Sequence, residues 1–215
     1  MIDICFETGL MGDPVADQYA DRASFGHLFC TWYADNCADT CWVIDLEGRA
    51  EGYLLGCADV RTMRQDAHMS EFVRRHVLAR GLLVRPGTAH WFARAIADMR
   101  SDRRALRNPA DLERYPAELH IDLMPSMRGL GLGRALTARL FEELADRGVP
   151  GVHLRTWGEN TDAIAFFRSI GFHSCGQRVP SGGFRTLGIT GSNQTAAPLD
   201  AGRRSTVRTF VRPLP

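Results

Sequence analysis

A run of glycines in the second half of the chain has the composition of an anion-binding turn. It reads Arg128-Gly129-Leu130-Gly131-Leu132-Gly133, and Arg134 follows it. The first turn of a helix has unpaired N–H groups and a partial positive charge, and glycines let a ligand approach the backbone closely. If a helix begins in this run, its amides form a cradle for a diphosphate, and Arg128 and Arg134 add charge-assisted hydrogen bonds.

The flanking residues predict the strand and the helix that such a cradle needs. Residues 119–123 alternate apolar and polar side chains as a half-buried strand does, and Pro125 ends sheet hydrogen bonding because it lacks an N–H. Apolar residues then recur every fourth position, the spacing of a helix stripe, and Gly148 with Pro150 closes this helix. The four apolar positions of the stripe are Leu132, Leu136, Leu140 and Leu144.

The glycine spacing disfavours two common nucleotide ligands. A Walker loop needs Gly-Lys-Ser or Gly-Lys-Thr, and the sequence has no such triplet, which disfavours adenosine triphosphate. A dinucleotide fingerprint reads Gly-x-Gly-x-x-Gly, and the register at 129, 131 and 133 places no glycine at position 134, which disfavours nicotinamide cofactors. The alternative for a glycine-rich turn of this kind is a tight connection without a ligand.

A second motif follows the predicted helix. Residues 152–156 have the composition of a buried strand, and Asn160 precedes a segment whose apolar side chains share a helix face. Gly171 suits the C-terminal cap of this helix. The shared face consists of Ala163, Phe166, Phe167 and Ile170.

With these two motifs, residues 118–172 resemble the GNAT superfamily of acyl-coenzyme A dependent N-acetyltransferases. In that family R/Q-x-x-G-x-G/A opens the helix that holds the pyrophosphate, and N-x-x-A-x-x-F-Y-x-x-x-G-F follows about thirty residues later. Upstream, residues 41–56 are similar to the family's central hairpin. Apolar runs that flank a turn with Gly48 also favour a hairpin on their own.

The resemblance implies a fold and a ligand. The expected fold is α/β (α+β), with a mixed, mostly antiparallel twisted sheet flanked by helices and with a splayed central strand pair. The expected ligand is acetyl-CoA or coenzyme A, whose pantetheine arm lies between the splayed strands and bonds to the backbone of Leu123 and Met124. The residues implied to bind the coenzyme are Leu123, Met124, Arg128, Gly129, Leu130, Gly131, Leu132, Gly133, Arg134, Asn160, Phe166 and Phe167.

Transfer of an acetyl group from a thioester to an amine requires a base that deprotonates the amine. Three polar residues two positions apart share one face of the predicted strand 119–123 and of the residue before it. They are Glu118, His120 and Asp122. Asp122 ranks first because it is nearest the expected splay, and His120 ranks second because its ordinary pKa suits neutral pH. The alternative is that this polar face pairs with arginines of a neighbouring insertion and has no catalytic role.

Phe167 departs from the family pattern, which usually has Tyr at this position to protonate the leaving thiolate. Phe has no proton to donate. Two functions therefore stay open. The first is an N-acetyltransferase acting on the amine of a small molecule or protein. The second is a catalytically weak or inactive acetyl-CoA-binding module.

The length of 215 residues and the 45% hydrophobic content predict one domain over residues 1–215. Residues 14–36 are expected to be mostly helical. Residues 60–115 are expected to form a helical insertion with segments such as Ser70 to Arg80 and Ala89 to Arg100, because a structureless loop of this length is uncommon. Residues 180–204, rich in Gly, Ser, Thr and Ala, are expected to form a mobile loop between two closing strands. This layout also resembles bacterial relatives of the acetyltransferase-like C-terminal domain of eukaryotic O-GlcNAcases, some of which are suspected of having lost catalysis.

The remaining features limit partners and location. The net charge is +1 with acidic and basic residues interspersed, so no nucleic-acid footprint is expected. No 18-residue apolar span and no signal peptide occur, which predicts a cytoplasmic protein without a membrane partner. The oligomeric state is left open between a monomer and a homodimer. Six cysteines at irregular spacings predict that most of the thiols are buried rather than part of a metal site. Cys37 and Cys41 would be one helical turn apart if they were helical, but they lack a partnering pair.

Overall fold

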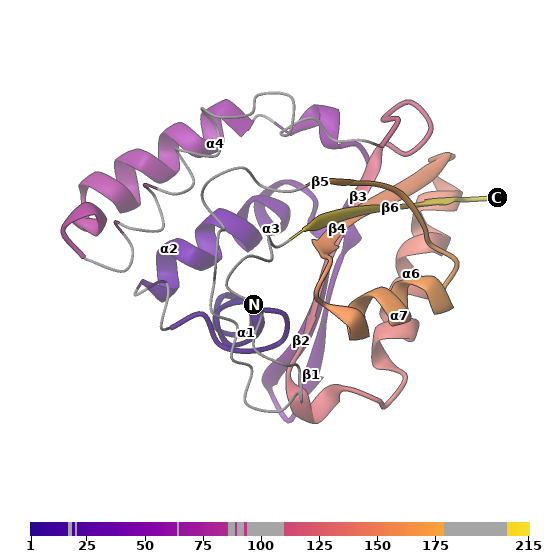
Figure 1. Ribbon diagram of the computed structural model, residues 1–215, viewed down its shortest axis with the longest axis horizontal. Helices are drawn as coiled ribbons and strands as arrows, with labels where there is room; N and C mark the ends of the chain where they lie inside the picture. The colour runs from indigo at the N-terminus through magenta and orange to yellow at the C-terminus, as the bar shows by residue number, and fades with distance from the viewer. Residues whose placement is uncertain are drawn as a thin grey trace.

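The computed structural model describes residues 1–16, 19, 21–63, 65–85, 89, 93, 110–178 and 206–215. Its centre is a six-stranded sheet with the strand order β1-β2-β3-β4-β6-β5, flanked by helices on both faces (Figure 1). The strands are β1 Cys41–Leu46, β2 Arg49–Cys57, β3 Ala117–Leu123, β4 Gly151–Trp157, β5 His173–Arg178 and β6 Val207–Pro213. Every pairing is antiparallel except that of β3 with β4. The predicted mixed, mostly antiparallel fold is therefore confirmed.

The parallel pair β3 and β4 is joined along only a short part of its length. Ala117 pairs with Val152 and Glu118 with His153, at the start of both strands. β3 meanwhile stays paired with β2 as far as Leu123, and β4 stays paired with β6 as far as Trp157. Since each strand keeps its outer partner but not its inner one, the sheet splays open between residues 119–123 and 154–157. This is the splay that the family resemblance implied.

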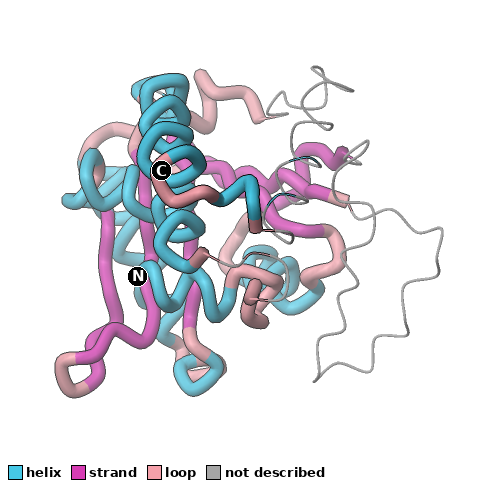
Figure 2. The backbone as a smooth tube through the Cα atoms, turned by 90° about the vertical axis from the view of Figure 1, so that its left-hand side faces the viewer, coloured by secondary structure: helices cyan, strands magenta, loops and turns pink. Residues whose placement is uncertain are grey.

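The β1–β2 hairpin has the two-residue turn that its sequence favours. Glu47 and Gly48 have φ angles of 54° and 82°, and the N–H of Gly48 donates to the Asp45 carboxylate at 2.8 Å. Two successive positive φ angles match the twist of the flanking strands. This turn and the glycine-rich turn that follows β3 lie at the same end of the molecule (Figure 2).

One face of the sheet is covered by α6 Leu132–Asp146 and α7 Thr161–Ser169 (Figure 1). Leu140 and Leu144 of α6 are fully buried, as their place in the apolar stripe predicted. Gly148 and Gly171 follow the two helices with φ angles of 68° and 93°, the left-handed geometry of a C-terminal cap. The core on this face consists of Leu54, Ala117, Leu119, Leu140, Leu144, Val152, Leu154, Ile164, Phe167, Ile170, Phe172, Phe210 and Leu214.

The opposite face is covered by the N-terminal helices α1 Ile2–Thr8, α2 Arg22–Gly26 and α3 Trp32–Asn36, with the π-helical segment η1 His27–Thr31 joining the last two. The predicted helix over 14–36 is wrong in its first part, because residues 14–16 are not helical and the helix begins at Arg22. Asp21 sets this start, since its side chain accepts the Ser24 N–H at 2.9 Å. The sequence interpretation also missed α1, whose Ile4, Cys5 and Phe6 are buried.

The segment between β2 and β3 contains helices in its described part up to residue 85, whereas residues 110–116 are turn or irregular. The predicted helix over 70–80 is observed as α4 Gln65–Phe72 continued by the π-helical segment η4 Val73–Leu78, so it begins five residues earlier and ends two residues earlier. The ring of His27 on η1 stacks on that of His68 on α4, with centroids 4.8 Å apart. This contact places α4 against the N-terminal helices.

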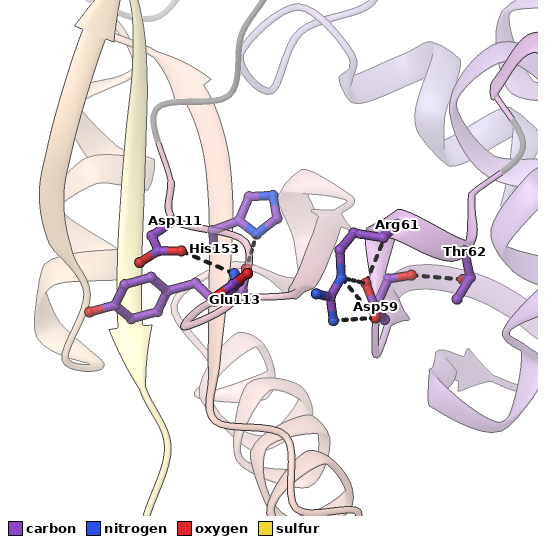
Figure 3. Close-up of polar contacts among 7 residues, drawn as sticks. Asp59, Arg61, Thr62, Asp111, Glu113 and His153 are labelled. Atoms are coloured by element: carbon purple, nitrogen blue, oxygen red, sulfur yellow. Dashed lines mark hydrogen bonds and ion pairs between the residues drawn. The ribbon is translucent and has the colours of Figure 1, made fainter.

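Local hydrogen bonds fix both ends of this insertion (Figure 3). At its start, the Asp59 carboxylate accepts hydrogen bonds from the backbone N–H and from the guanidinium of Arg61. At its end, the Asp111 carboxylate accepts the Glu113 N–H, and His153 of β4 contacts the carbonyl of Tyr115 at 2.8 Å. The two ends are joined where the N–H of Val60 donates to the carbonyl of Pro116. β3 therefore begins at a fixed position.

Two sequence predictions lie outside the described residues. These are most of the helix expected over 89–100 and the whole of the mobile loop expected over 180–204. The closing strands that flank the second segment, β5 and β6, pair as an antiparallel hairpin as predicted. Within the described part of the chain, no helix has the length and hydropathy needed to cross a membrane.

Candidate active site

A cavity of about 710 Å³ passes through the splay between β3 and β4. One wall is β3 from Glu118 to Asp122, and the facing wall is β4 from Leu154 to Trp157. One end opens toward α7, at Asn160, Ala163 and Phe167. The other end reaches the N-terminal helices, where Val15, Tyr19, Phe25, Leu28, Phe29, Trp32, Tyr33 and Met63 contribute to its lining. The cavity therefore connects the two faces of the sheet.

A hydrogen-bonded group of three side chains lies on the β3 wall. The Tyr53 hydroxyl donates to Oδ2 of Asp122 at 2.5 Å, and Nε2 of His120 is 2.9 Å from the same oxygen. The Tyr53 oxygen is also 3.2 Å from Nε2 of His120. Tyr53 of β2 reaches this position because it pairs with Asp122 in the β2–β3 register. The structure thus brings together the two sequence-predicted bases, Asp122 and His120, and adds Tyr53.

The protonation of His120 follows from its neighbours. Burial lowers the pKa of His120, but the charge of Asp122 and the hydrogen bond to it outweigh burial and raise the pKa to about 9. At neutral pH the pair is therefore an imidazolium bound to a carboxylate. Burial and the negative charge of Asp122 raise the pKa of the Tyr53 hydroxyl well above its usual value. Tyr53 therefore stays neutral and donates a hydrogen bond to Asp122.

Replacing His120 with Gln should destabilise the protein in a pH-dependent way. The folded-state pKa of about 9 lies above the ordinary value of 6.5, so the stabilisation from protonated His120 is complete below the ordinary value and is lost as the pH rises through about 9. We expect the difference in melting temperature between the wild type and His120→Gln to be large near pH 6 and small above about pH 9.5. Thermal unfolding followed by circular dichroism checks this, and a difference that is constant or grows with pH contradicts it.

The third predicted base, Glu118, is engaged in a separate network. Its carboxylate accepts from the Tyr33 hydroxyl at 3.3 Å and from the Arg155 guanidinium at 3.0 Å. The side chain is 11% exposed. The expected alternative for this polar face was pairing with arginines of the insertion, but the ion-pair partner is on β4. Glu118 therefore links β3 to β4 and to α3 at the closed end of the splay.

The glycine turn has the geometry of an open cradle. Gly129 and Gly131 have φ angles of 74° and 80°, and a Cβ atom at either position would meet no atom within 4 Å. The first backbone bond of α6 runs from the N–H of Ala135 to the carbonyl of Gly131, which leaves the preceding helical N–H groups without a partner inside the helix. Gly133 is different, because a Cβ there would lie 3.3 Å from the ring of Phe166. Gly133 lets α6 and α7 approach each other.

The two arginines of the motif contact the protein itself. Arg128 donates from Nε to the carbonyl of Leu123 at 3.1 Å and from Nη2 to the carbonyl of Gly12 at 2.9 Å. It thereby joins the end of β3 to the loop after α1. Arg134 donates from Nη2 to the Ser169 hydroxyl at 3.1 Å, which joins α6 to the end of α7. In this structure both arginine side chains therefore connect the segments on either side of the glycine turn.

Comparisons with known proteins agree with this geometry. A model of the acetyltransferase (GNAT) family matches residues 104–172, the part of the chain that contains β3, the glycine turn, α6, β4 and α7. The crystal structure of SsHAT is similar over 99% of this chain and 91% of that one, with 28% sequence identity and a TM-score of 0.68. Residues 104–172 therefore have the sequence pattern of the GNAT family.

Other acetyltransferases match a smaller part of the sequence or have a lower identity. A mycothiol acetyltransferase of Nocardiopsis dassonvillei is 46% identical over 48 residues, which span 22% of this chain and 14% of that protein. The match is thus confined to a small part of the relative. A ribosomal-protein-alanine N-acetyltransferase from Brucella melitensis covers 98% of this chain and 91% of its own, with 18% identity and a TM-score of 0.51, and it supports the fold alone.

The second GNAT motif places Asn160 and Phe167 at the cavity. Asn160 caps α7 by accepting the Ala163 N–H at 3.2 Å, and its side chain also lines the cavity. Phe167 is 6% exposed and packs against Phe166 and Phe172. The structure therefore places an apolar ring where the GNAT pattern usually has a tyrosine hydroxyl.

Cysteines approach the β3 network from the N-terminal helices. The Cys5 thiol, a ring nitrogen of His120 and a carboxylate oxygen of Asp122 lie within 4.8 Å of one another, a spacing that a metal ion can use. His120 and Asp122 already contact each other and Tyr53, so hydrogen bonding accounts for their arrangement. The Cys30 thiol donates to the Tyr53 oxygen at 3.6 Å. At the pair considered in the sequence, the Cys41 thiol donates to the carbonyl of Cys37 at 3.1 Å.

The sequence interpretation missed Tyr53, Tyr33 and Arg155, three residues that contact the predicted bases. Tyr53 lies in the hairpin that the family resemblance did identify. Pairing this hairpin antiparallel with strand 117–123 would have placed Tyr53 beside Asp122, because cross-strand partners share a face. Tyr33 and Arg155 had no such signal, since they reach Glu118 from a helix and from the far side of the splay.

Proposed function

We propose that this chain transfers an acetyl group from acetyl-CoA to a primary amine. The observation that carries the proposal is the position of the Asp122 network on the wall of a cavity that passes through the β3–β4 splay and reaches α7. A thioester in the splay and an amine on the side of the N-terminal helices would meet at this wall. The match of residues 104–172 to the GNAT family model supports the same reaction.

We assign coenzyme binding to the glycine turn and the splay. The N–H groups at the start of α6, from Gly129 to Arg134, would hold the pyrophosphate. The backbone of Leu123 and Met124 would bond to the pantetheine arm, and Asn160 would donate its side-chain amide near the same arm. Leu130 is 64% exposed beside the turn and offers an apolar contact. The bound substrate supplies the thioester, and the protein supplies orientation and proton transfer.

In the proposed reaction, Asp122 accepts a proton from the entering ammonium group. The nitrogen lone pair then forms a C–N bond with the thioester carbonyl carbon, the C–S bond breaks, and its electron pair leaves with sulfur. The second amine proton goes to the thiolate or to water. His120 is an imidazolium at neutral pH, so its role is to hold Asp122 rather than to take the proton. This favours Asp122 over His120 as the base.

A second function is supported by Phe167. Because this ring has no proton to give the departing thiolate, a protein that binds acetyl-CoA without turning it over is the alternative. Incubation with acetyl-CoA and a panel of amines, with detection of free thiol, separates the two. Amine-dependent thiol release supports the transferase. Tight coenzyme A binding in a calorimeter without thiol release for any amine supports the binding module.

The remaining predictions concern the whole protein. We propose that residues 1–215 form one domain, because the two main hydrophobic clusters lie on opposite faces of a single sheet. The cytoplasmic location and the monomeric or dimeric state stay predictions. The resemblance to the relatives of the O-GlcNAcase domain also stays a prediction.

A further inference from the structure

The helix that faces the cavity presents an aromatic stripe to it. The segment from Arg22 to Asn36 is helical throughout, and Phe25, Phe29 and Trp32 recur along it at spacings of four and three residues. Such residues lie on one face of a helix. The rings of Phe25 and Phe29 are 4.7 Å apart at their centroids. Phe29 and Trp32 are half-buried and line the cavity, so part of their apolar surface is free to contact a ligand.

Most of the polar groups at this end of the cavity are acidic or already paired, and the exception is His68, whose Nε2 is buried without a hydrogen-bond partner among the described residues. Asp122 accepts from Tyr53 and is bound to His120, and Glu118 is bound to Arg155. Arg155 supplies the one arginine among the cavity-lining residues that the structure describes, and its guanidinium is 3.0 Å from the Glu118 carboxylate. A ligand carboxylate placed here would face two carboxylates without an uncommitted guanidinium to bind it.

A ligand ammonium group would have the opposite environment. It would approach Asp122 on the β3 wall, while the rest of the molecule contacted the apolar side chains of the helix. Burial of an aromatic or branched body against such side chains is favourable in proportion to its area. The cavity therefore matches a molecule with one cationic end and one apolar end.

Resting on the proposed function, we infer that the acceptor is a primary amine with an aromatic or branched apolar body and without a carboxylate. The amine end is recognised by Asp122, and the apolar end by Phe29 and Trp32. Polyamines lack the apolar body, and amino acids carry the excluded carboxylate. Both are therefore poor acceptors.

Three probe amines test this inference. 2-Phenylethylamine has the expected body, L-phenylalanine adds a carboxylate to it, and putrescine has two amines without an aromatic group. We expect kcat/KM for 2-phenylethylamine to exceed that for each of the other two by about 10-fold or more, because site contacts of this kind discriminate by that order. Equal or better acetylation of putrescine or L-phenylalanine overturns the inference while the proposed acetyltransferase function stands.

Variants of Phe29 locate the apolar contact. Phe29→Ala should raise KM for 2-phenylethylamine about 10-fold with kcat nearly unchanged, and Phe29→Leu should recover part of the loss. Val43→Ala is the control, since Val43 is 52% exposed on β1 and does not line the cavity. A KM for Phe29→Ala that matches the control overturns the assignment.

A binding measurement keeps the test independent of turnover. With coenzyme A present, calorimetry should show that 2-phenylethylamine binds at least about 10-fold more tightly than putrescine. Selective binding without acetylation supports the inference and counts against the proposed reaction. Absence of selectivity in binding counts against the inference, whether or not coenzyme A binds.

Discussion

Replacing Asp122 with Asn should lower kcat/KM for amine acetylation by about 10²–10⁴-fold, the range that a positioned general base supplies. The asparagine keeps the shape of the side chain and can still contact Tyr53 and His120, but it cannot accept the amine proton. Since Asp122 is not part of the glycine turn, the affinity for coenzyme A should stay within about twofold of the wild type. Thiol-release kinetics and calorimetry together check both expectations.

Two comparisons sharpen this prediction. Asp35→Asn removes an exposed carboxylate from α3 outside the cavity lining and should leave kcat/KM unchanged. Tyr53→Phe removes the hydroxyl that donates to Asp122 at 2.5 Å but leaves the base in place. Its kcat/KM should therefore fall less than that of Asp122→Asn. Turnover by Asp122→Asn at the wild-type rate would show that proton transfer occurs elsewhere.

Replacing Gly131 with Asp should weaken coenzyme A binding by about 100-fold. The new carboxylate would project from the open cradle, because a Cβ at this position has no protein atom within 4 Å. At a separation of about 4 Å, its repulsion by a phosphate lies between about 1 kcal/mol in water and about 4 kcal/mol at an effective dielectric constant of about 20. A 100-fold loss of affinity corresponds to about 2.7 kcal/mol, which lies within this range. Gly131→Asn has the same shape without the charge, and we expect its loss of affinity to be about tenfold smaller.

Gly48→Asp provides a matched control for backbone strain. Gly48 has a φ angle of 82°, close to the 80° of Gly131, and a Cβ atom at Gly48 in the hairpin turn would likewise meet no atom within 4 Å. Both substitutions therefore place the same side chain in the same left-handed conformation. Calorimetric titration should show that Gly131→Asp lowers the affinity for coenzyme A and that Gly48→Asp does not. Equal affinities for the two variants would mean that the pyrophosphate is not held at Gly131.

The sequence was sufficient for the elements around the glycine turn because local rules act there without competition. Each boundary of these elements is marked by a residue with a specific backbone preference or capping side chain, and the structure has the boundaries at these residues. They are Pro125 after β3, Gly131 before α6, Asn160 before α7 and Gly171 after α7. The alternation of Glu118, His120 and Asp122 likewise placed the polar face of β3 correctly, because a strand has a fixed period of two.

Features that depend on long-range contacts were less predictable. α1 is a short helix whose Ile4 and Phe6 are buried by tertiary packing, so its own sequence carried little signal. The role of Tyr53 depends on the β2–β3 register, and the pairing of Glu118 with Arg155 crosses the splay. Arg128 was predicted from its charge to meet a phosphate, yet its guanidinium contacts the carbonyls of Gly12 and Leu123.

The position of bound acetyl-CoA tests the central claim most directly. A crystal structure of the complex should show the pyrophosphate on the backbone amides of residues 129–134 and the thioester inside the β3–β4 splay, with its carbonyl carbon facing the Asp122 side of the cavity. Electron density that placed the pyrophosphate away from the glycine turn, or the thioester outside the splay, would contradict the account.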